Sequence, residues 1–232
     1  MPLPIYLAMT AAEFRKNPKN SAKIGWMACH FSPYGTGLSN FPTQLPEGSL
    51  LILNDRTPVC GHDPTLIAEQ LLSLTGQFRC SRVLLDLQRP GNAETAKIVR
   101  KILQALPCPV AVSEAYGASF SCPIFLPPIP VLQAPTQYLS PWQGREIWLE
   151  ADLRQTNYLI TENGAVSEPY RHMDEAVFHH DQALCCRYCM ADTPEGLRFS
   201  IQNDPQLFDP SVEALGVTCK IGLYQELGCS DQ

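Results

Sequence analysis

The sequence predicts an α/β protein, and within that class a compact, irregular (β/α)8 TIM-type barrel with some helices replaced by loops or β-hairpins. Short apolar runs alternate with amphipathic stretches. Nearly continuous apolar runs separated by helices are typical of parallel strands covered on both faces. Eight such strands in 232 residues fit a barrel, and we expect residues 1–232 to form one domain. The runs that we assign to these strands begin near residues 24, 49, 82, 110, 122, 146, 184 and 217.

A doubly wound open sheet is the alternative architecture. The chain contains neither G-x-G-x-x-G nor G-x-x-x-x-G-K-[ST], the phosphate-binding loops of such sheets. The barrel is therefore favoured, and no cofactor is expected.

The first half of the chain reads as regular β-α units. Asp63 and Pro64 have the residue types of a helix N-cap and first helical position, and apolar residues follow at helical spacing up to Gly76. A second helix is predicted from Asn92 to the prolines that begin at Pro107. The strands predicted around these helices are 24–31, 49–55, 82–88 and 110–114.

The second half is less regular. The dipeptide Asn163-Gly164 predicts a β-hairpin over 158–166, because both residues tolerate the positive φ of a tight turn. A second hairpin is predicted where Thr193-Pro-Glu-Gly196 reverses the chain. The other elements predicted here are strands at 122–126, 146–150, 183–190, 197–201 and 217–226, a brief helix at 135–142, and a last helix at 204–216.

Composition excludes several classes of function. Lys and Arg number 17 against 23 Asp and Glu, which argues against a general affinity for nucleic acid. No window approaches 18 apolar residues, so no membrane span is expected. The N-terminus lacks the basic and apolar regions of a secretory signal, and most of the ten cysteines lie in apolar runs. We therefore expect a cytoplasmic protein with reduced cysteines.

Polar residues gather where the predicted strands end, and in a (β/α)8 barrel the active site lies at that end. Six strands end in this way, five of them with a carboxylate, although any strand that reaches solvent tends to become polar. The ligand expected there is small and polar, such as a carbohydrate. Candidate catalytic residues are Asp86, Glu114 and Glu226. Candidate ligand-binding residues are His30, Asp55, Gln88, Tyr116, Glu150 and Tyr224.

The strand at 81–88, Ser-Arg-Val-Leu-Leu-Asp-Leu-Gln, resembles the signature strand D-G-x-D-x-D-x-E of chitinase-type (family 18) glycoside hydrolase barrels. Asp86 matches the last Asp of that motif. Leu84 stands in place of an Asp, and Gln88 falls where the family carries its general-acid Glu. Because an amide cannot protonate a leaving sugar oxygen, the resemblance implies either a binding relative or another carboxylate as the acid.

Two classes of function stay open. As an enzyme, the protein would hydrolyse a glycoside by acid-base chemistry: Asp86 would stabilise charge or orient a neighbour, Glu114 or Glu226 would be the acid or base, and the Gln88 amide would hold the ligand. The alternative is a non-catalytic binding or scaffold barrel.

The sequence also contains residue types of a zinc site and aromatic residues that could stack on a sugar, and burial in the core is the alternative for both. Two residues three apart on a strand, such as Cys186 and Cys189, point to opposite faces, so core cysteines and no metal site are expected. Trp26 and Trp148 lie within predicted strands and are expected in the core. The zinc candidates are His179, His180, Cys185, Cys186 and Cys189, and the candidate platforms are Trp26, Trp142, Trp148 and Tyr116.

Overall fold

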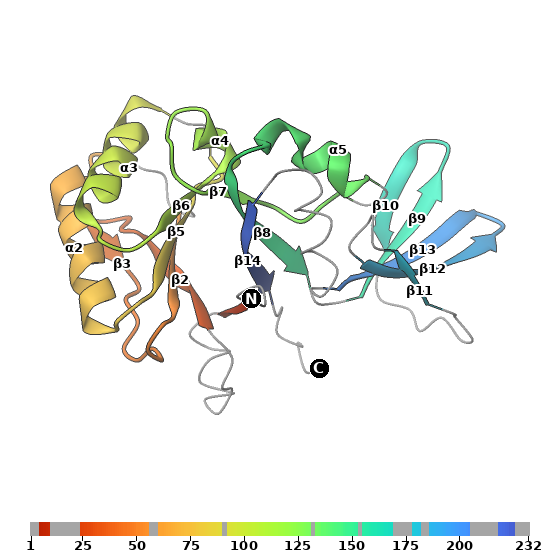
Figure 1. Ribbon diagram of the computed structural model, residues 1–232, viewed down its shortest axis with the longest axis horizontal. Coiled ribbons are helices and arrows are strands. Elements are labelled where there is room, and N and C mark those ends of the chain that lie inside the picture. The colour runs from red at the N-terminus through yellow and green to blue at the C-terminus, as the bar shows by residue number, and fades with distance from the viewer. Residues whose placement is uncertain are drawn as a thin grey trace.

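The computed structural model contains a large parallel sheet covered by helices and a second, smaller antiparallel sheet (Figure 1). The α/β class predicted from the sequence is confirmed. The structure describes residues 5–9, 24–55, 60–89, 92–130, 133–152, 155–168, 178–181, 186–204 and 218–225.

The large sheet is parallel except for one short edge strand. Neighbours pair in the order β14, β8, β7, β6, β5, β4, β2, and β1 pairs in parallel with both β14 and β2. The two-residue strand β3 (Leu38–Ser39) pairs antiparallel with β2. The parallel strands are β1 (Ile5–Met9), β2 (Ile24–Phe31), β4 (Leu50–Asn54), β5 (Arg82–Asp86), β6 (Val110–Ser113), β7 (Ile124–Leu126), β8 (Glu146–Asp152) and β14 (Thr218–Gln225).

Two long helices lie side by side against this sheet, α2 (Pro64–Gln77) and α3 (Ala93–Ala105) (Figure 1). Each begins where the sequence predicts, because a side chain at the N-cap accepts an otherwise unpaired backbone N–H. Asp63 accepts the N–H of Thr65 at 2.8 Å, and Asn92 accepts that of Thr95 at 2.8 Å. The shorter helices are α4 (Glu114–Gly117), α5 (Pro135–Leu139) and the 3-10 turn η1 (Ser140–Trp142).

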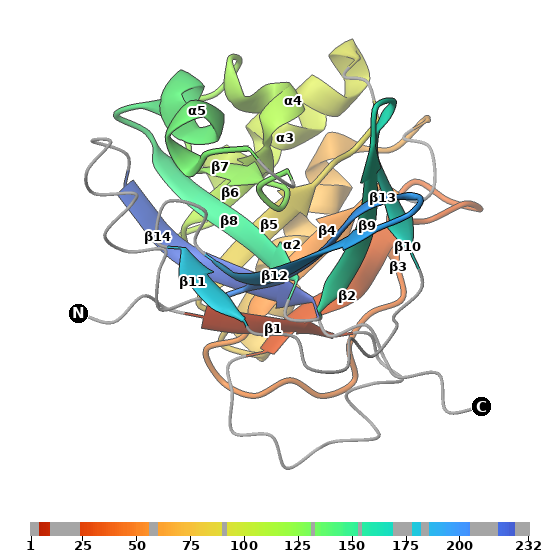
Figure 2. The same cartoon turned by 90° about the vertical axis from the view of Figure 1, so that its right-hand side faces the viewer.

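The second sheet is inserted between β8 and β14 and is antiparallel throughout. Figure 1 shows it at the end of the molecule opposite α2, and Figure 2 looks onto it from its own side. Both predicted hairpins are present here. Its strands, in order across the sheet, are β10 (Gly164–Glu168), β9 (Thr156–Thr161), β13 (Gly196–Asn203), β12 (Cys186–Thr193) and β11 (His179–Asp181).

This insertion corrects one strand assignment. The run near 184 was predicted as a parallel strand of the large sheet, but β12 pairs antiparallel with β13 because the turn at 193–196 folds the chain back at once. Among the described residues, the eighth parallel strand of the large sheet is β1 instead. Its five apolar residues are too few to be distinctive, and one of its two partners, β14, lies far along the chain. The helix predicted at 204–216 lies almost wholly outside the described residues.

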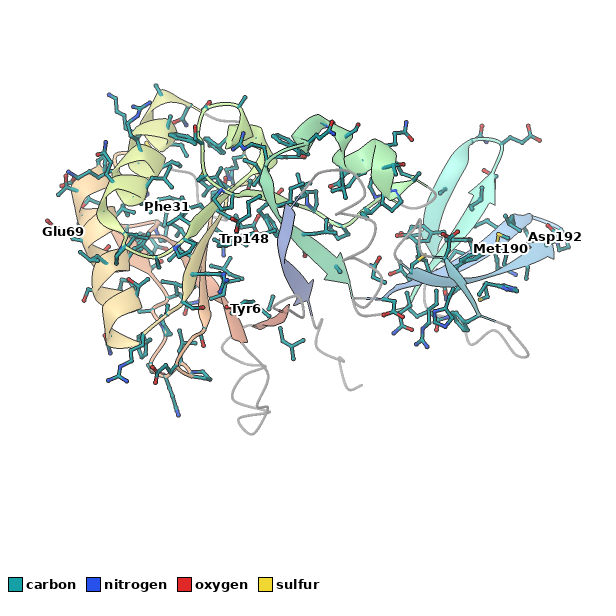
Figure 3. All side chains as sticks on the ribbon, in the orientation of Figure 1. Tyr6, Phe31, Glu69, Trp148, Met190 and Asp192 are labelled. Atoms are coloured by element: carbon teal, nitrogen blue, oxygen red, sulfur yellow. The ribbon has the colours of Figure 1, made fainter. Side chains whose placement is uncertain are left out.

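Two hydrophobic clusters lie on opposite faces of the large sheet. The larger one fills the space between the strands and the helices. The smaller one, which we call the inner cluster, takes alternate residues from six strands, as the two-residue period of a strand requires. Figure 3 labels two of its members, Tyr6 and Trp148. The inner cluster consists of Tyr6, Ala8, Leu50, Ile52, Leu84, Ala111, Phe125 and Trp148.

Candidate functional site

Four strands carry a polar residue one step beyond the inner cluster, at their C-terminal ends. In each case this residue lies two positions after a cluster member, so strand periodicity places it on the same face as the cluster. Asn54 is paired in register with Asp86, whereas Ser113 is level with Phe125 and Trp148, so Glu150 lies two residues further along its strand. Because the strands are parallel, their C-terminal ends meet at one edge of the sheet. We call these residues the polar layer: Asn54, Asp86, Ser113 and Glu150.

The pKa of the Asp86 carboxyl group is raised above its ordinary value. Its burial raises the pKa, the nearby charge of Asp55 raises it further, and a hydrogen bond from Gln88 opposes both effects. In that bond, Gln88 Nε2 donates to Asp86 Oδ1. Asp86 therefore keeps its proton to a higher pH than an exposed Asp, and the Gln88 amide lies directly beside it.

The segment that carries Gln88 is held by side chains from the neighbouring strands. Asp55 is only 5% exposed, and its two carboxylate oxygens accept the backbone N–H groups of Gln88 at 3.0 Å and Arg89 at 2.8 Å. The hydroxyl of Ser113 accepts the N–H of Leu87 at 2.8 Å. Asp55, predicted to bind the ligand directly, has its carboxylate engaged by the protein backbone.

A second group of polar side chains centres on Tyr138 in α5. Burial raises the pKa of Tyr138, and the charges of Glu114 and Glu150 raise it further. These two carboxylates, from α4 and β8, therefore lie near one phenol. The hydroxyl of Tyr138 donates to the carbonyl of Pro127 at 2.9 Å. The structure thus brings two predicted site residues, Glu114 and Glu150, to the same neighbour.

The short helix α4 carries Glu114, which is exposed, and Tyr116, which is only 3% exposed. Arg145 fixes the end of this helix. Its guanidinium donates to the backbone carbonyls of Gly117 in α4 at 3.3 Å and of Phe120 and Cys122 after it, both at 2.8 Å. The Trp142 ring packs so closely on Gly117 that a Cβ there would lie 2.7 Å from it. Both contacts fix the position from which Glu114 projects.

Sequence reasoning missed Asn54, Ser113 and Tyr138. The first two were detectable, because counting by twos from Leu50 or Ala111 leads to them. No local signal marks Tyr138, since its neighbours come from distant parts of the chain.

The remaining candidates are only partly described. The backbone of His30 pairs with Asn54, and that of Tyr224 pairs with Ala151. The side chains of His30, Tyr224 and Trp26 lie outside the described part, and so does all of Glu226.

The structure also bears on the aromatic and zinc candidates. Trp148 is 1% exposed, so its assignment to the core is confirmed. Cys186 and Cys189 are buried in β12, whereas His179 and His180 are exposed on β11; Cys185 is outside the described residues. Within the described ranges, no three His, Cys, Asp or Glu side chains are grouped as metal ligands.

None of the described helices has both the length and the apolarity needed to cross a membrane.

The chain matches no protein-family model and no curated protein sequence. Solved structures do resemble it. The spore cortex-lytic enzyme SleL of Bacillus megaterium QM B1551 superposes with a TM-score of 0.57 at 8% identity, over 96% of this chain and 70% of that one. A chitinase from Chromobacterium violaceum gives 0.56 at 9% identity, over 99% and 96%. A GH18 chitinase from Cycas revoluta in complex with (GlcNAc)3 gives 0.54 at 9% identity, over 95% and 94%. At such low identity the likeness is one of fold, and the chain has a fold similar to that of glycoside hydrolases.

Proposed function

We propose that this protein binds an oligosaccharide at the polar layer, and that the large sheet closes through β1 into a (β/α)8 barrel whose mouth is this site. The parallel pairing of β1 with both β14 and β2 supports the closure. Active sites of (β/α)8 barrels lie at the C-terminal ends of the strands, where the polar layer is. Nuclear Overhauser contacts from β1 to both neighbouring strands are the expected result in solution, and their absence on one side would contradict closure.

The single observation that carries the binding proposal is the polar layer itself. It places an amide (Asn54) and two carboxyl groups (Asp86 and Glu150) on the face of the apolar inner cluster, while the hydroxyl of Ser113 is bonded to the backbone of Leu85 and Leu87. Sugar hydroxyls need this mixture, because each can donate one hydrogen bond and accept two. The Cycas revoluta chitinases, which share the fold, were solved with (GlcNAc)3 and (GlcNAc)4 bound, so oligomers of N-acetylglucosamine are the ligand class we propose.

Binding without hydrolysis is favoured by the side chain beside Asp86. At the position of the family's general acid this chain has Gln88, which donates a hydrogen bond to Asp86 but has no acidic proton to give to a leaving group. The chain therefore lacks a carboxylic acid at position 88, whereas the carboxyl group of Asp86 beside it is present.

Hydrolysis is the second candidate, and the raised pKa of Asp86 favours it. A carboxyl group that stays protonated at higher pH can act as a general acid. The second carboxylate would come from Glu114 or Glu150, whose charges both act on Tyr138. In this case Asp86, rather than Gln88, would protonate the leaving oxygen.

Calorimetric titration of the purified protein with (GlcNAc)4 tests the binding proposal. We expect measurable affinity in the wild type and at least a roughly 10-fold loss in Asp86→Ala, since a hydrogen-bonded polar group is removed from the site. Glu69→Gln is the matched control, because Figure 3 places Glu69 on the outer side of α2. No heat of binding in the wild type, or equal loss in the control, would refute the proposal.

The two candidates are separated by Gln88→Glu, which supplies the missing acid. If the site is a binding site, the wild type leaves (GlcNAc)4 intact and this variant gains hydrolysis, with about 10²- to 10⁴-fold available from a general acid. If Asp86 is already the acid, the wild type hydrolyses the substrate, and Asp86→Asn abolishes that activity while Gln88→Ala retains it. Glu114→Gln then shows whether Glu114 is the second carboxylate.

A further inference from the structure

Three consecutive backbone N–H groups, those of Leu87, Gln88 and Arg89, are bound by side chains rather than by a neighbouring strand. Ser113 Oγ accepts the first, and the two oxygens of Asp55 accept the second and third. In the opposite direction, the Arg89 side chain donates through Nε to the backbone carbonyl of Asp55 at 2.9 Å. The ends of β4 and β5 are thus tied together in both directions.

These bonds begin where the strand pairing stops. The ladder between β4 and β5 ends with the pair Asn54 and Asp86, and that between β5 and β6 ends at Leu85. Beyond these pairs, residues 87–89 have no strand partner in the described ladders. Gln88 shares the face of Asp86 only while the backbone between them stays extended, so its position depends on what replaces the ladder.

The burial of Asp55 makes these bonds strong. A carboxylate that is 5% exposed must be compensated by donors, and here two N–H groups supply one bond to each oxygen. Bonds to an ionised acceptor are roughly twice as strong as those between neutral groups. Both oxygens of Asp55 therefore serve to fix the segment.

We infer that Asp55 is a positioning residue of the site: its carboxylate substitutes for the missing ladder and holds Gln88 beside Asp86, where both face the ligand. The part of this inference that concerns the ligand rests on the proposed function. The part that concerns the segment 87–89 stands on the hydrogen bonds alone, so the two can fail separately.

The charge of Asp55 adds a second consequence. It raises the pKa of Asp86, alongside burial and against the hydrogen bond from Gln88. Around this pair, the charge of Asp55 also raises the pKa of Tyr116 in α4, and the Arg89 guanidinium donates to the backbone carbonyl of Asp55. The carboxylates of Glu114 and Glu150 act on Tyr138 instead. Asp55→Asn removes the charge and keeps the shape, so the pKa of Asp86 falls in that variant.

Amide hydrogen exchange tests the positioning without any ligand. In Asp55→Ala we expect the amides of Gln88 and Arg89 to exchange about 10- to 100-fold faster, because both lose a charged acceptor. Asp55→Asn keeps one acceptor oxygen and should show a smaller effect on the same two amides. Protected amides of α3 report whether each variant is folded. Unchanged exchange at 88 and 89 in folded variants would overturn the inference.

Titration with (GlcNAc)4 tests the consequence for the site. We expect Asp55→Asn to weaken binding about 10-fold, with little further loss on adding Gln88→Ala, because coupled residues are not additive. The pH midpoint of binding should move to lower pH, which a purely structural defect would not produce. Asp63→Asn, the same change at the N-cap of α2, should leave affinity, pH midpoint and exchange unchanged.

The outcomes are distinguishable. If the wild type does not bind (GlcNAc)4, the proposed function fails, and the exchange experiment still decides whether Asp55 holds the segment. If the wild type binds and Asp55→Asn binds equally well with the same pH midpoint, the positioning role is refuted and the proposed function stands.

Discussion

The same substitution, Gly to Ala, is expected to have opposite effects at two helical positions of this protein. At Gly117 in α4, a Cβ would lie 2.7 and 2.8 Å from two ring atoms of Trp142 and 3.0 Å from Ile124 Cδ1. At Gly76 in α2, the same atom would meet nothing within 4 Å. Neither glycine has a positive φ, so backbone strain does not complicate the comparison.

The magnitudes follow from packing and helix entropy. Ala favours a helix over Gly by at most roughly 0.5–1 kcal/mol at these sites, since both lie in the last turn of their helices. At Gly117 the overpacking costs about 1–3 kcal/mol, because Ile124 is fully buried and the indole ring must move. Gly117→Ala should therefore lose about 1–2 kcal/mol of unfolding free energy, and Gly76→Ala should gain about 0.4–1 kcal/mol.

Urea denaturation and thermal unfolding measure both variants. For a chain of this size 1 kcal/mol corresponds to about 2–4 °C, so Tm should fall by about 2–8 °C in Gly117→Ala and rise by about 1–4 °C in Gly76→Ala. If Gly117→Ala were as stable as Gly76→Ala, the Trp142 ring would not pack on Gly117. The claim that this contact fixes α4, and with it Glu114, would then be refuted.

Three further substitutions test the hydrophobic core, the hydrogen bonds of Arg145 near α4, and the raised pKa of Asp86. Trp148→Ala removes a side chain that is 1% exposed in the inner cluster and should cost about 3–5 kcal/mol in urea unfolding; a loss below 1 kcal/mol would contradict its burial. Arg145→Met breaks three bonds to carbonyls and should cost about 1–3 kcal/mol, with faster amide exchange around α4 as the specific sign. The pKa of Asp86 is raised in the folded protein, so its contribution to stability is full below the unfolded pKa of about 3.9 and is lost as pH rises through the folded pKa. Relative to wild type, Asp86→Asn should therefore become more stable as pH increases, and a constant difference from about pH 3 to 8 would show that Asp86 is not perturbed.

Local signals were sufficient for several elements. Asp63 with Pro64, and Asn92, start α2 and α3 where predicted, since a cap bonds to backbone two or three residues away. The hairpin predicted from Asn163-Gly164 is present, but its turn residues are Glu162 and Asn163; Gly164 is the first residue of the next strand and alone adopts a positive φ, of 114°. In each case the physical cause lies within a few residues of the element, and a reading of the sequence can find it.

The pairing of strands that lie far apart in the chain could not be predicted from such local signals. β1 contacts β14, more than two hundred residues later in the chain, and nothing in Ile5–Met9 specifies that partner. The apolar run near 184 looked like any other buried strand. Its antiparallel direction followed from the turn after it and from the pairing of β13 with β9.

The candidate site also combines features that local sequence predicts with contacts between distant residues. Strand periodicity predicts the face of Asp86 in β5, whereas Gln88 lies beyond the strand and keeps that face through the bonds of Asp55 to residues 88 and 89. The carboxylate of Asp55 accepts the backbone N–H groups of Gln88 and Arg89, because a side chain that follows a strand can turn back to neighbouring backbone as easily as towards a ligand. Tyr138 entered only through its neighbours Glu114 and Glu150.

The sequence by itself determined the alternation of strands and helices, the caps and turns, and which face of β5 carries Asp86. Those features depend on backbone geometry and on interactions over a few residues. The tertiary structure alone decided that β1 takes a place in the large sheet and that Asp55 binds the segment 87–89. It also decided that the charges of two carboxylates, from α4 and β8, act on the phenol of Tyr138. Such contacts join residues far apart in the chain, and their energies depend on burial and distance that exist only once the chain is packed.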